Sequence, residues 1–383
     1  MKNIRLAIVL LGALLLANAA SAQNLIIQWA VTGWPSGNGW LPKATTDGQS
    51  GNVAIIDQTG TGDAQFNYFD GQMIVSDINY LYWDGPYDIT SSGQPSDEVG
   101  HEPSIAMVDC LIPSCTYYPG YTSDVIEVHQ GGQDNGGKLW FRTGVDTSFG
   151  TTWANAEPYD EGFNPTVALD QSGGTATNTT IVEVHQATVN SSLLWYHVGT
   201  LTYSDTSVSA SFDGSHSTTF TGYAPTVSVA RGVAVLMAQG PSGQLWYSVG
   251  TVNTTDGTIT WGSQTPYDTG YNPSVSVQWC SGGGDIFGCD FMVVEVHQKD
   301  SGTGPLMYRT GVMYYGDGGT PPTSINKWTP NSDTSYANGC YPSISVMTDN
   351  DGSFHPLLEA HSAACGGPAD VSASWGSIQN EIP

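Results

Sequence analysis

The sequence predicts an all-β fold in which four-stranded units repeat around a ring, and two observations carry this prediction. First, a Gly-aromatic-x-Pro turn, a segment like VEVHQ, a segment like LWY and a Trp-bearing segment recur in fixed order along the chain. Second, the segments alternate with period two between clusters of Gly, Ser, Asn and Asp, which is typical of strands and turns. Such a unit cannot bury both faces alone, so the units must pack on one another, as in a β-propeller.

The turn proline marks six units. It stands at Pro42, Pro103, Pro165, Pro225, Pro273 and Pro342, so that the units begin near residues 40, 101, 163, 223, 271 and 340. The segment 24–37 resembles a fourth strand, whereas the sixth unit ends without one. We therefore expect a six-bladed β-propeller of four-stranded blades in which the N-terminal strand completes blade six and leaves no open sheet edge.

One large aromatic residue recurs in the fourth strand of each unit. These residues are Trp29, Trp83, Trp153, Trp261 and Trp328, with Phe212 in the third unit. Aromatic residues could stack on sugars, but one copy per blade favours a role in the core between blades, because large aromatic side chains dominate burial.

The N-terminus has the pattern of an export signal. Lys2 and Arg5 precede an apolar run at 6–16, and Ala20-Ser21-Ala22 follows. We expect residues 1–22 to be a signal peptide cleaved near Ala22, and residues 23–383 to form a single secreted domain, extracellular or periplasmic. No later segment approaches the roughly 20 apolar residues that span a bilayer, so no membrane insertion is expected.

The composition limits the partners. The chain has 9 basic and 35 acidic residues, a formal net charge of -26. This charge argues against nucleic acid as a partner, since nucleic acid requires basic surface. The oligomeric state is left open. No cofactor is expected, with calcium the one ion left open.

The six cysteines form three local pairs. We expect disulfide bonds between Cys110 and Cys115, Cys280 and Cys289, and Cys340 and Cys365. The alternative is a metal site of free thiols, which the absence of a CxxC motif disfavours. Three disulfides agree with export.

An acid and an imidazole recur in the VEVHQ segment of four units. The pairs are Glu127 and His129, Glu183 and His185, Glu295 and His297, and Glu359 and His361. At spacing i, i+2 on a strand, both side chains of a pair lie on one face. Unit one has Ile55 and Asp57 at these positions, and unit four has Leu236 and Ala238.

The hairpin of unit four predicts what these pairs meet. A turn at 240–243 would pair Gln239 with Gln244, so that the Glu and His positions lie opposite Tyr247 and Leu245. The aromatic and basic residues of the third strand would then project from the other face and reach the Glu and His of a neighbouring blade. These residues are Trp140, Arg142, Trp195 and Arg309.

Three interpretations of this cluster remain open. Carboxylate, Arg and an aromatic face could form a repeated sugar pocket between blades. The same residues could instead be a hydrogen-bonded network that joins adjacent blades. Metal binding is the weakest interpretation, because two ligands per strand leave the coordination sphere incomplete.

Evidence for catalysis is slight. The sequence contains no GxSxG and no HExxH motif, although carboxylates from different blades could meet at a central channel and cleave glycosides. The non-repeated His101 and Glu102, with the loop 94–100 before them, are the place to look for a single unique site. The alternative there is an ordinary loop insertion.

The repeat resembles the secreted bacterial β-propeller repeats written NPSVAL, VVEVHQ and LWYRVG, and it is similar in architecture to propeller lectins. The resemblance covers nearly all of residues 23–383. It implies glycans or glycoconjugates as partners. We therefore expect a secreted, multivalent carbohydrate-binding propeller, with a channel-site glycoside hydrolase and a structural or adhesion scaffold as the alternatives.

Overall fold

The computed structural model describes residues 24–48, 51–62, 64–73, 81–88, 100–109, 123–132, 137–147, 150–170, 178–203, 207–280, 289–329, 334–347 and 355–381. The predicted signal peptide and the predicted Cys110–Cys115 bond lie outside these residues. Within them the fold is all-β, as predicted, with one short 3-10 helix, η3, at Asp317–Gly319.

Units two, three and four each form a separate sheet. In each sheet four strands pair in chain order, and a short fifth strand pairs with the third. Unit two contains β5 (Gly100–Asp109), β6 (Ser123–Gly131), β7 (Lys138–Thr147), β8 (Gly150–Trp153) and β9 (Glu157–Glu161). Unit three contains β10 (Phe163–Leu169), β11 (Asn178–Gln186), β12 (Leu193–Tyr203), β13 (Val208–Phe212) and β14 (His216–Thr221). Unit four contains β15 (Tyr223–Ala230), β16 (Val233–Gln239), β17 (Gln244–Asn253), β18 (Thr258–Trp261) and β19 (Thr265–Thr269).

Units five, six and one are joined into one sheet, because two long strands each belong to two units. Unit five contains β20 (Tyr271–Trp279), β21 (Phe291–Gln298), β22 (Gly304–Met313) and β23 (Lys327–Trp328). Unit six contains the second half of β24 (Thr334–Val346), β25 (His355–Ser362) and β26 (Ala369–Glu381). Unit one contains the second half of β1 (Asn24–Thr46), β2 (Asn52–Gln58), β3 (Phe66–Met73) and β4 (Leu81–Asp88). The sheets are thus built from four-stranded units of the kind that form propeller blades.

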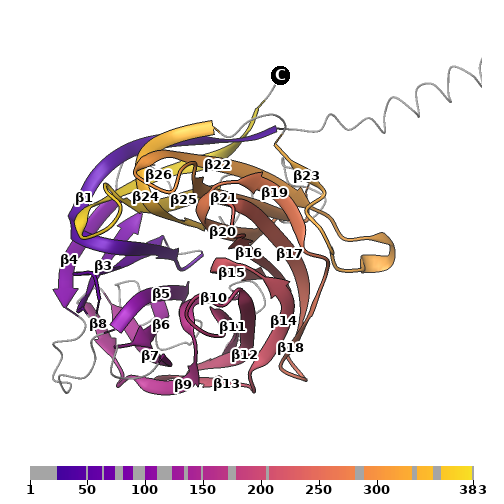
Figure 1. The fold of residues 1–383 in the computed structure, drawn as a ribbon, viewed down its shortest axis with the longest axis horizontal. Helices are drawn as coiled ribbons and strands as arrows, with labels where there is room; N and C mark the ends of the chain where they lie inside the picture. The colour runs from indigo at the N-terminus through magenta and orange to yellow at the C-terminus, as the bar shows by residue number, and fades with distance from the viewer. Residues whose placement is uncertain are drawn as a thin grey trace, which may run out of the picture.

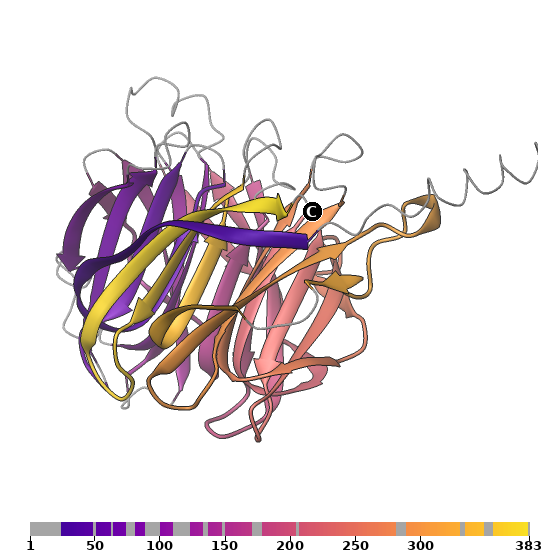
Figure 2. The same ribbon diagram turned by 90° about the horizontal axis from the view of Figure 1, so that it is seen from above.

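The first half of β1 pairs antiparallel with β26, from Asn24 opposite Glu381 to Gly39 opposite Ala369. Both views show the indigo N-terminal strand beside the yellow C-terminal strand (Figures 1 and 2). The second half of β1 pairs with β2. The N-terminal strand therefore contributes the fourth strand of unit six, at the position that the sequence pattern predicts.

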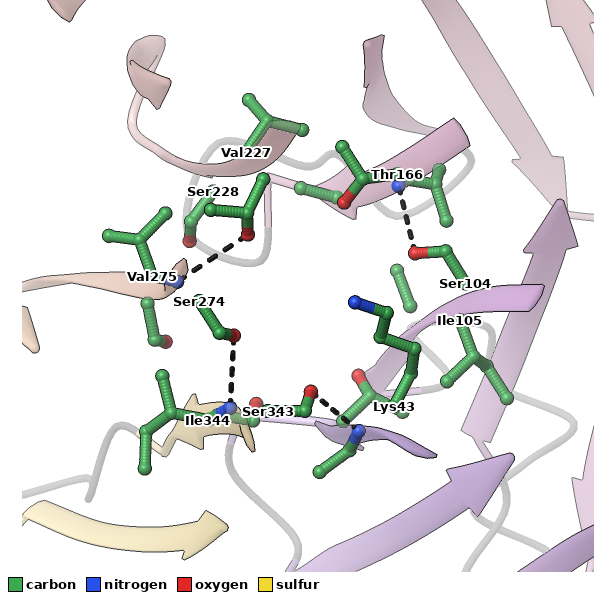
Figure 3. Close-up of a pocket in the computed structure, with 18 of the residues that line it drawn as sticks. Lys43, Ser104, Ile105, Thr166, Val227, Ser228, Ser274, Val275, Ser343 and Ile344 are labelled. Carbon is green, nitrogen blue, oxygen red and sulfur yellow. Dashed lines mark hydrogen bonds between the residues drawn. The ribbon is translucent and has the colours of Figure 1, made fainter. Parts of the chain in front are cut away.

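The units surround a common centre, with β5, β10, β15 and β20 nearest to it (Figure 1). A small hollow of about 80 Å³ lies there, lined by the first strands of all six units. We call it the channel. Ser and Thr hydroxyl groups of one first strand accept hydrogen bonds from backbone N–H groups of the next, as Ser104 does from Val167 at 3.1 Å (Figure 3). The same contact joins Ser343 of unit six to Ala44 of unit one at 2.9 Å.

Among the described residues the hydrophobic core is divided into six clusters, one between each two successive units. One cluster combines Val53 and Ile55 of unit one with Leu358 and Trp375 of unit six. The fourth-strand aromatic residues extend these clusters outward: Trp261 packs edge-on against Tyr196 and Phe220 of unit three, and Trp328 stacks on Tyr267 of unit four. The predicted core role of Trp29, Trp153, Trp261, Trp328 and Phe212 is confirmed by such contacts. The side chain of Trp83 is not described.

Two of the three predicted disulfides are present. Cys280 is bonded to Cys289 across the start and end of the β20–β21 connection, and Cys340 is bonded to Cys365 beside the β25–β26 turn. Their Cα atoms are 5.8 and 5.4 Å apart. Each bond lies within one unit, as the local pairing predicts.

Candidate functional sites

The four Glu–His pairs are buried. The residues Glu127, Glu183, Glu295 and Glu359 are 0% exposed, and their histidine partners are at most 5% exposed. In each pair the histidine Nδ1 lies 3.0 to 3.2 Å from the carboxylate oxygens of the glutamate two residues before it. In these contacts the Nδ1 N–H group donates the hydrogen bond and the carboxylate oxygens accept it.

The predicted strand register is wrong by one residue. Gln239 pairs with Leu245, and Glu127 lies directly opposite Arg142, whose Nε donates to Glu127 at 3.1 Å. The reason is the turn: Gly240 N–H donates to the Gln244 carbonyl group, which leaves a three-residue loop with Gly243 at φ 77°. A three-residue hairpin loop with a left-handed Gly is a common alternative to the four-residue turn that the prediction assumed.

The correction changes which residues share a face. The third-strand residues lie on the same face as the Glu and His of their own unit, not on the opposite face. Trp140 pairs with His129, Trp195 with His185, and Arg309 with Glu295. Trp140 and Trp195 are half-buried. The neighbouring unit instead contributes the residues three and two positions before the turn glycine, which the sequence analysis did not select.

At the interface between units four and five, those residues are Tyr267 and Asp268 of β19. The Tyr267 hydroxyl donates to Glu295 at 3.0 Å, and Arg309 forms an ion pair with Asp268. Burial and then the charge of Glu295 hold the pKa of Tyr267 well above its usual value, so the phenol keeps its proton. We call this group, Tyr267, Asp268, Glu295, His297 and Arg309, interface 4/5.

The interface between units two and three has histidine in place of arginine. Asp160 Oδ2 lies 2.7 Å from His197 Nε2 and 3.6 Å from His185 Nε2. Burial raises the pKa of Asp160, but hydrogen bonds from His197 and the Glu161 backbone outweigh it and hold the pKa at about 2. Burial lowers the pKa of His197, but the hydrogen bond to Asp160 and the charge of Glu183 raise it overall. We call Tyr159, Asp160, Glu183, His185 and His197 interface 2/3.

The interface between units three and four is apolar. Leu236 and Ala238 replace the Glu and His, and Phe220 packs in one buried cluster with them. The acid, the imidazole and the phenol that would donate to the acid are therefore all absent from this cluster. A buried donor without an acceptor is costly, so these residues are expected to change together.

The turn glycine and the final Gln of VEVHQ also act between strands and units. A Cβ at Gly100, Gly162, Gly270 or Gly339 would clash with the histidine ring of the same unit, which explains the glycine before each turn. The Gln298 side-chain oxygen accepts from Tyr341 N–H of the next unit at 2.8 Å, and Gln58 accepts from Glu102 N–H at 3.1 Å. The whole VEVHQ motif thus has contacts that hold the units together.

A larger hollow of about 670 Å³ opens at the end of the channel where the six proline turns meet. We call it the mouth hollow. Trp40, Phe163, Tyr223 and Tyr341 give it aromatic walls, and Asn164, Asn272, Gln130, Gln186 and Gln239 supply amide groups. It contains the predicted unique residues His101 and Glu102, together with Lys43, which also lines the channel.

The backbone around the mouth hollow is strained at six equivalent positions. The residue before each turn proline has φ between 45° and 54°, and none of the six is glycine: Leu41, Glu102, Asn164, Ala224, Asn272 and Tyr341. Positive φ at a residue other than Gly costs on the order of 1 to 3 kcal/mol, and such positions cluster at binding sites. Each also lies at a break in strand register, where the first strand has one extra residue, and each lines the mouth hollow.

Lys43 and Glu102 are the amine and the acid at the mouth hollow. Lys43 lies among the residues lining the channel, and its amino group points into the middle of the ring that these residues form (Figure 3). Burial raises the pKa of Glu102 to about 7, although the charge of Lys43 acts against this shift. Burial lowers the pKa of Lys43, and the charge of Glu102 partly offsets that effect. Among the described residues that line the two hollows, Glu102 is the single carboxylate, so they do not supply the paired carboxylates of the predicted hydrolase alternative.

Comparison with known proteins shows the fold. No protein-family model and no curated protein matches the sequence. Among solved structures, a fucose-specific lectin from Aleuria aurantia matches with a TM-score of 0.50 at 10% identity, over 90% of this chain and 97% of the lectin. The same lectin in complex with alpha-methyl-L-fucoside matches with a TM-score of 0.51 at 12% identity, over 91% of this chain and 97% of the lectin. The NanB sialidase from Streptococcus pneumoniae matches with a TM-score of 0.51 at 11% identity, over 92% of this chain and 70% of the sialidase.

The class of protein is therefore an all-β protein with a propeller-type fold. In the part of the chain that the structure describes, no helix has the length and apolar character needed to cross a membrane.

Proposed function

We propose that this chain is a carbohydrate-binding β-propeller with six blades, closed by the pairing of β1 with β26, and that it binds a glycan in the mouth hollow. Two observations support the closed ring: a hydrophobic cluster lies between units six and one, and the Ser343 hydroxyl accepts from Ala44 across the same junction. The disulfides support an exported protein, extracellular or periplasmic.

The mouth hollow is the observation that carries the binding proposal. It combines aromatic walls with amide groups, one acid and one amine. A sugar offers an apolar ring face to the aromatic side chains and hydroxyl groups to planar amides and a carboxylate, which is the usual composition of such sites. The solved lectin bound to alpha-methyl-L-fucoside and the sialidase share this fold, which supports a carbohydrate as the ligand.

The sites predicted at the Glu–His pairs are an alternative location for sugar binding. Those residues are at most 5% exposed and hydrogen-bond to one another, so a sugar would reach them only if two units separated. Binding between blades at these pairs stays a prediction. It differs from the mouth hollow in number, since four pairs would give several sites and the mouth hollow gives one.

A glycan array followed by calorimetric titration of the best ligand tests the proposal. Trp40→Ala removes an aromatic wall of the mouth hollow and should weaken binding about tenfold or more. Trp246→Ala is the matched control, because Trp246 is also half-buried but lies outside the mouth hollow. Its affinity should be unchanged.

Three results would contradict the proposal. An array without any bound glycan would remove the function, and an equal loss in both variants would remove the site. A loss in Trp195→Ala with none in Trp40→Ala would place the sugar at the Glu–His pairs instead.

A further inference from the structure

Interface 2/3 brings three ligand atoms to one point. His185 Nε2, His197 Nε2 and an Asp160 carboxylate oxygen all lie within 4.8 Å of one another. The two imidazole rings are stacked, with 27° between their planes. They come from adjacent strands of unit three, β11 and β12, whereas Asp160 comes from β9 of unit two. The cluster is thus formed only where the two units meet.

The other ring nitrogen of each imidazole, Nδ1, already forms a hydrogen bond. His185 Nδ1 donates to Glu183 at 3.1 Å, and His197 Nδ1 donates to the Asp213 backbone carbonyl group at 2.8 Å. Metal-binding histidines nearly always donate their second ring N–H to a carboxylate or a backbone carbonyl group, which fixes the ring and its tautomer. Both partners that such a site requires are therefore in place, and both Nε2 atoms face the carboxylate.

We propose that Asp160, His185 and His197 bind a divalent transition-metal ion of the zinc type. Two imidazole nitrogens and one carboxylate favour zinc and its neighbours over calcium or magnesium, which take oxygen ligands. Ligand atoms about 2.1 Å from a tetrahedral ion stand about 3.4 Å apart, close to the 3.6 Å between Asp160 and His185. The hydrogen-bonded contact of 2.7 Å between Asp160 and His197 opens by less than about 1 Å when the ion enters.

The proposed metal site is accessible to solvent, and its coordination sphere has an open position, as in reactive metal centres. The side chains of His185 and His197 are 1% and 4% exposed, but that of Asp160 is 25% exposed and provides a path for the ion. Three protein ligands leave the fourth position to water, as in zinc sites that bind or activate a further molecule.

Interface 4/5 provides the natural control. It has the same acid and histidine, Asp268 and His297, but Arg309 takes the place of His197 and forms an ion pair with Asp268. A guanidinium group stays protonated and cannot bind a metal. The two interfaces therefore differ in metal-binding capacity through one residue.

The test is titration of the chelator-treated full chain with Co²⁺ and Zn²⁺, followed by visible absorption of bound Co²⁺ and by metal analysis after dialysis. One equivalent should bind, and the ion should raise the melting temperature. His197→Arg should abolish binding while the chelator-treated fold is kept, because Arg309 occupies this position in unit five. Glu183→Gln should weaken binding about 10- to 100-fold, since it removes only the outer partner of His185.

The reciprocal variant Arg309→His should gain a second equivalent, with Asp268 and His297 as the other ligands. His216→Ala is the control for histidine outside the cluster and should leave the equivalents unchanged. The proposal is overturned by a parent chain that binds no ion, by a folded His197→Arg variant that keeps its equivalent, or by loss of the ion in His216→Ala.

Discussion

Interfaces 2/3 and 4/5 are built from equivalent strands, and their five named residues differ in one position, where His197 corresponds to Arg309. Each contains a buried glutamate, a histidine that donates to it, and a Tyr-Asp pair from the preceding unit. With Arg309, the aspartate is satisfied by a permanent cation, whereas with His197 it is satisfied by a group that can lose its proton or bind a metal. The difference shows that one side chain decides whether an inter-unit contact is only structural or is also chemically responsive.

The largest expected effect is on stability, from breaking interface 4/5. Glu295→Ala leaves Tyr267 and His297 without their acceptor in a buried place, and should lower the free energy of unfolding by about 3 to 5 kcal/mol. Urea unfolding measures it. The triple variant Glu295→Leu, His297→Ala and Tyr267→Phe removes the acid and both of its donors, as Leu236 and Ala238 do between units three and four, and should lose much less. Equal losses in both would show that the polar group is not acting as one network.

The second-largest effect on the free energy of unfolding should come from Asp57, a buried acid whose side-chain hydrogen bond comes from a neutral amide. Asp57 occupies the histidine position of unit one, its Oδ1 accepts from the neutral Asn67, and burial raises its pKa to about 7. The pKa of Asp57 is about 7 in the folded state and 3.8 in the unfolded state. Between these pH values the unfolded state loses the proton more readily than the folded state, so the stability falls as the pH rises from about 4 to about 7. Asp57→Asn should therefore raise the unfolding free energy by about 2 to 4 kcal/mol at about pH 9 and by little at about pH 4.

Unfolding curves at the two pH values provide the measurement. A gain of the same size at both would mean that the carboxyl group is already ionised at low pH and that its burial is not the cause.

A smaller effect should separate the two interfaces by pH, in the presence of a chelator. The pKa of Asp160 is lowered to about 2, so its contribution is present above 3.8 and is lost as the pH falls through 2. The pKa of His197 is raised, so its contribution is present below 6.5 and is lost as the pH rises through the folded value. Asp160→Asn should therefore cost about 1 to 2 kcal/mol near pH 5 and clearly less near pH 9.

Asp268→Asn is the comparison for this pH dependence. Arg309 stays charged, so the cost of losing Asp268 should persist at about pH 9. Parallel pH profiles for the two variants would contradict the assignment of His197 as the titrating partner.

The smallest expected effect is at the interface between units five and six. Tyr336 donates to Glu359 at 3.0 Å, while Ala337 replaces the aspartate and Ser374 stands opposite Glu359 in place of arginine. Tyr336→Phe removes one hydrogen bond, and Glu359 keeps His361. We expect a loss of about 1 kcal/mol in chemical denaturation. A loss as large as that of Glu295→Ala would mean that this interface depends on its phenol alone.

The repeat made most of the architecture predictable from sequence. Period-two alternation and the recurring proline turn gave the strands, and the Trp before the first turn gave the pairing of β1 with β26. The register of the β16–β17 hairpin was missed because loops of three and four residues share the same Gly-Pro-Ser-Gly signal, and only the backbone conformation of Gly243 distinguishes them. A one-residue shift exchanges the two faces, so Arg142 was expected on the wrong one.

The sites were less predictable. The recurring Pro-Tyr-Asp before the turn glycine was visible in the sequence, but its contact with the next unit depends on how the units pack. Lys43 stands where the other five units have Ser or Thr, a difference that the sequence analysis did not select, and the charge of Glu102 acts on it only in the assembled channel. His101 and Glu102 could be selected because they break the repeat, and both line the mouth hollow.

The number of glycan molecules bound per chain tests the central claim most directly. If the mouth hollow is the site, calorimetric titration of the best array ligand should give one molecule per chain. Glu183→Gln should then lower the melting temperature without changing that number or the affinity, whereas Glu102→Gln should keep the melting temperature and weaken binding. Several molecules per chain, with one fewer in a Glu183→Gln variant of unchanged stability, would contradict the account and place the sugars at the Glu–His pairs.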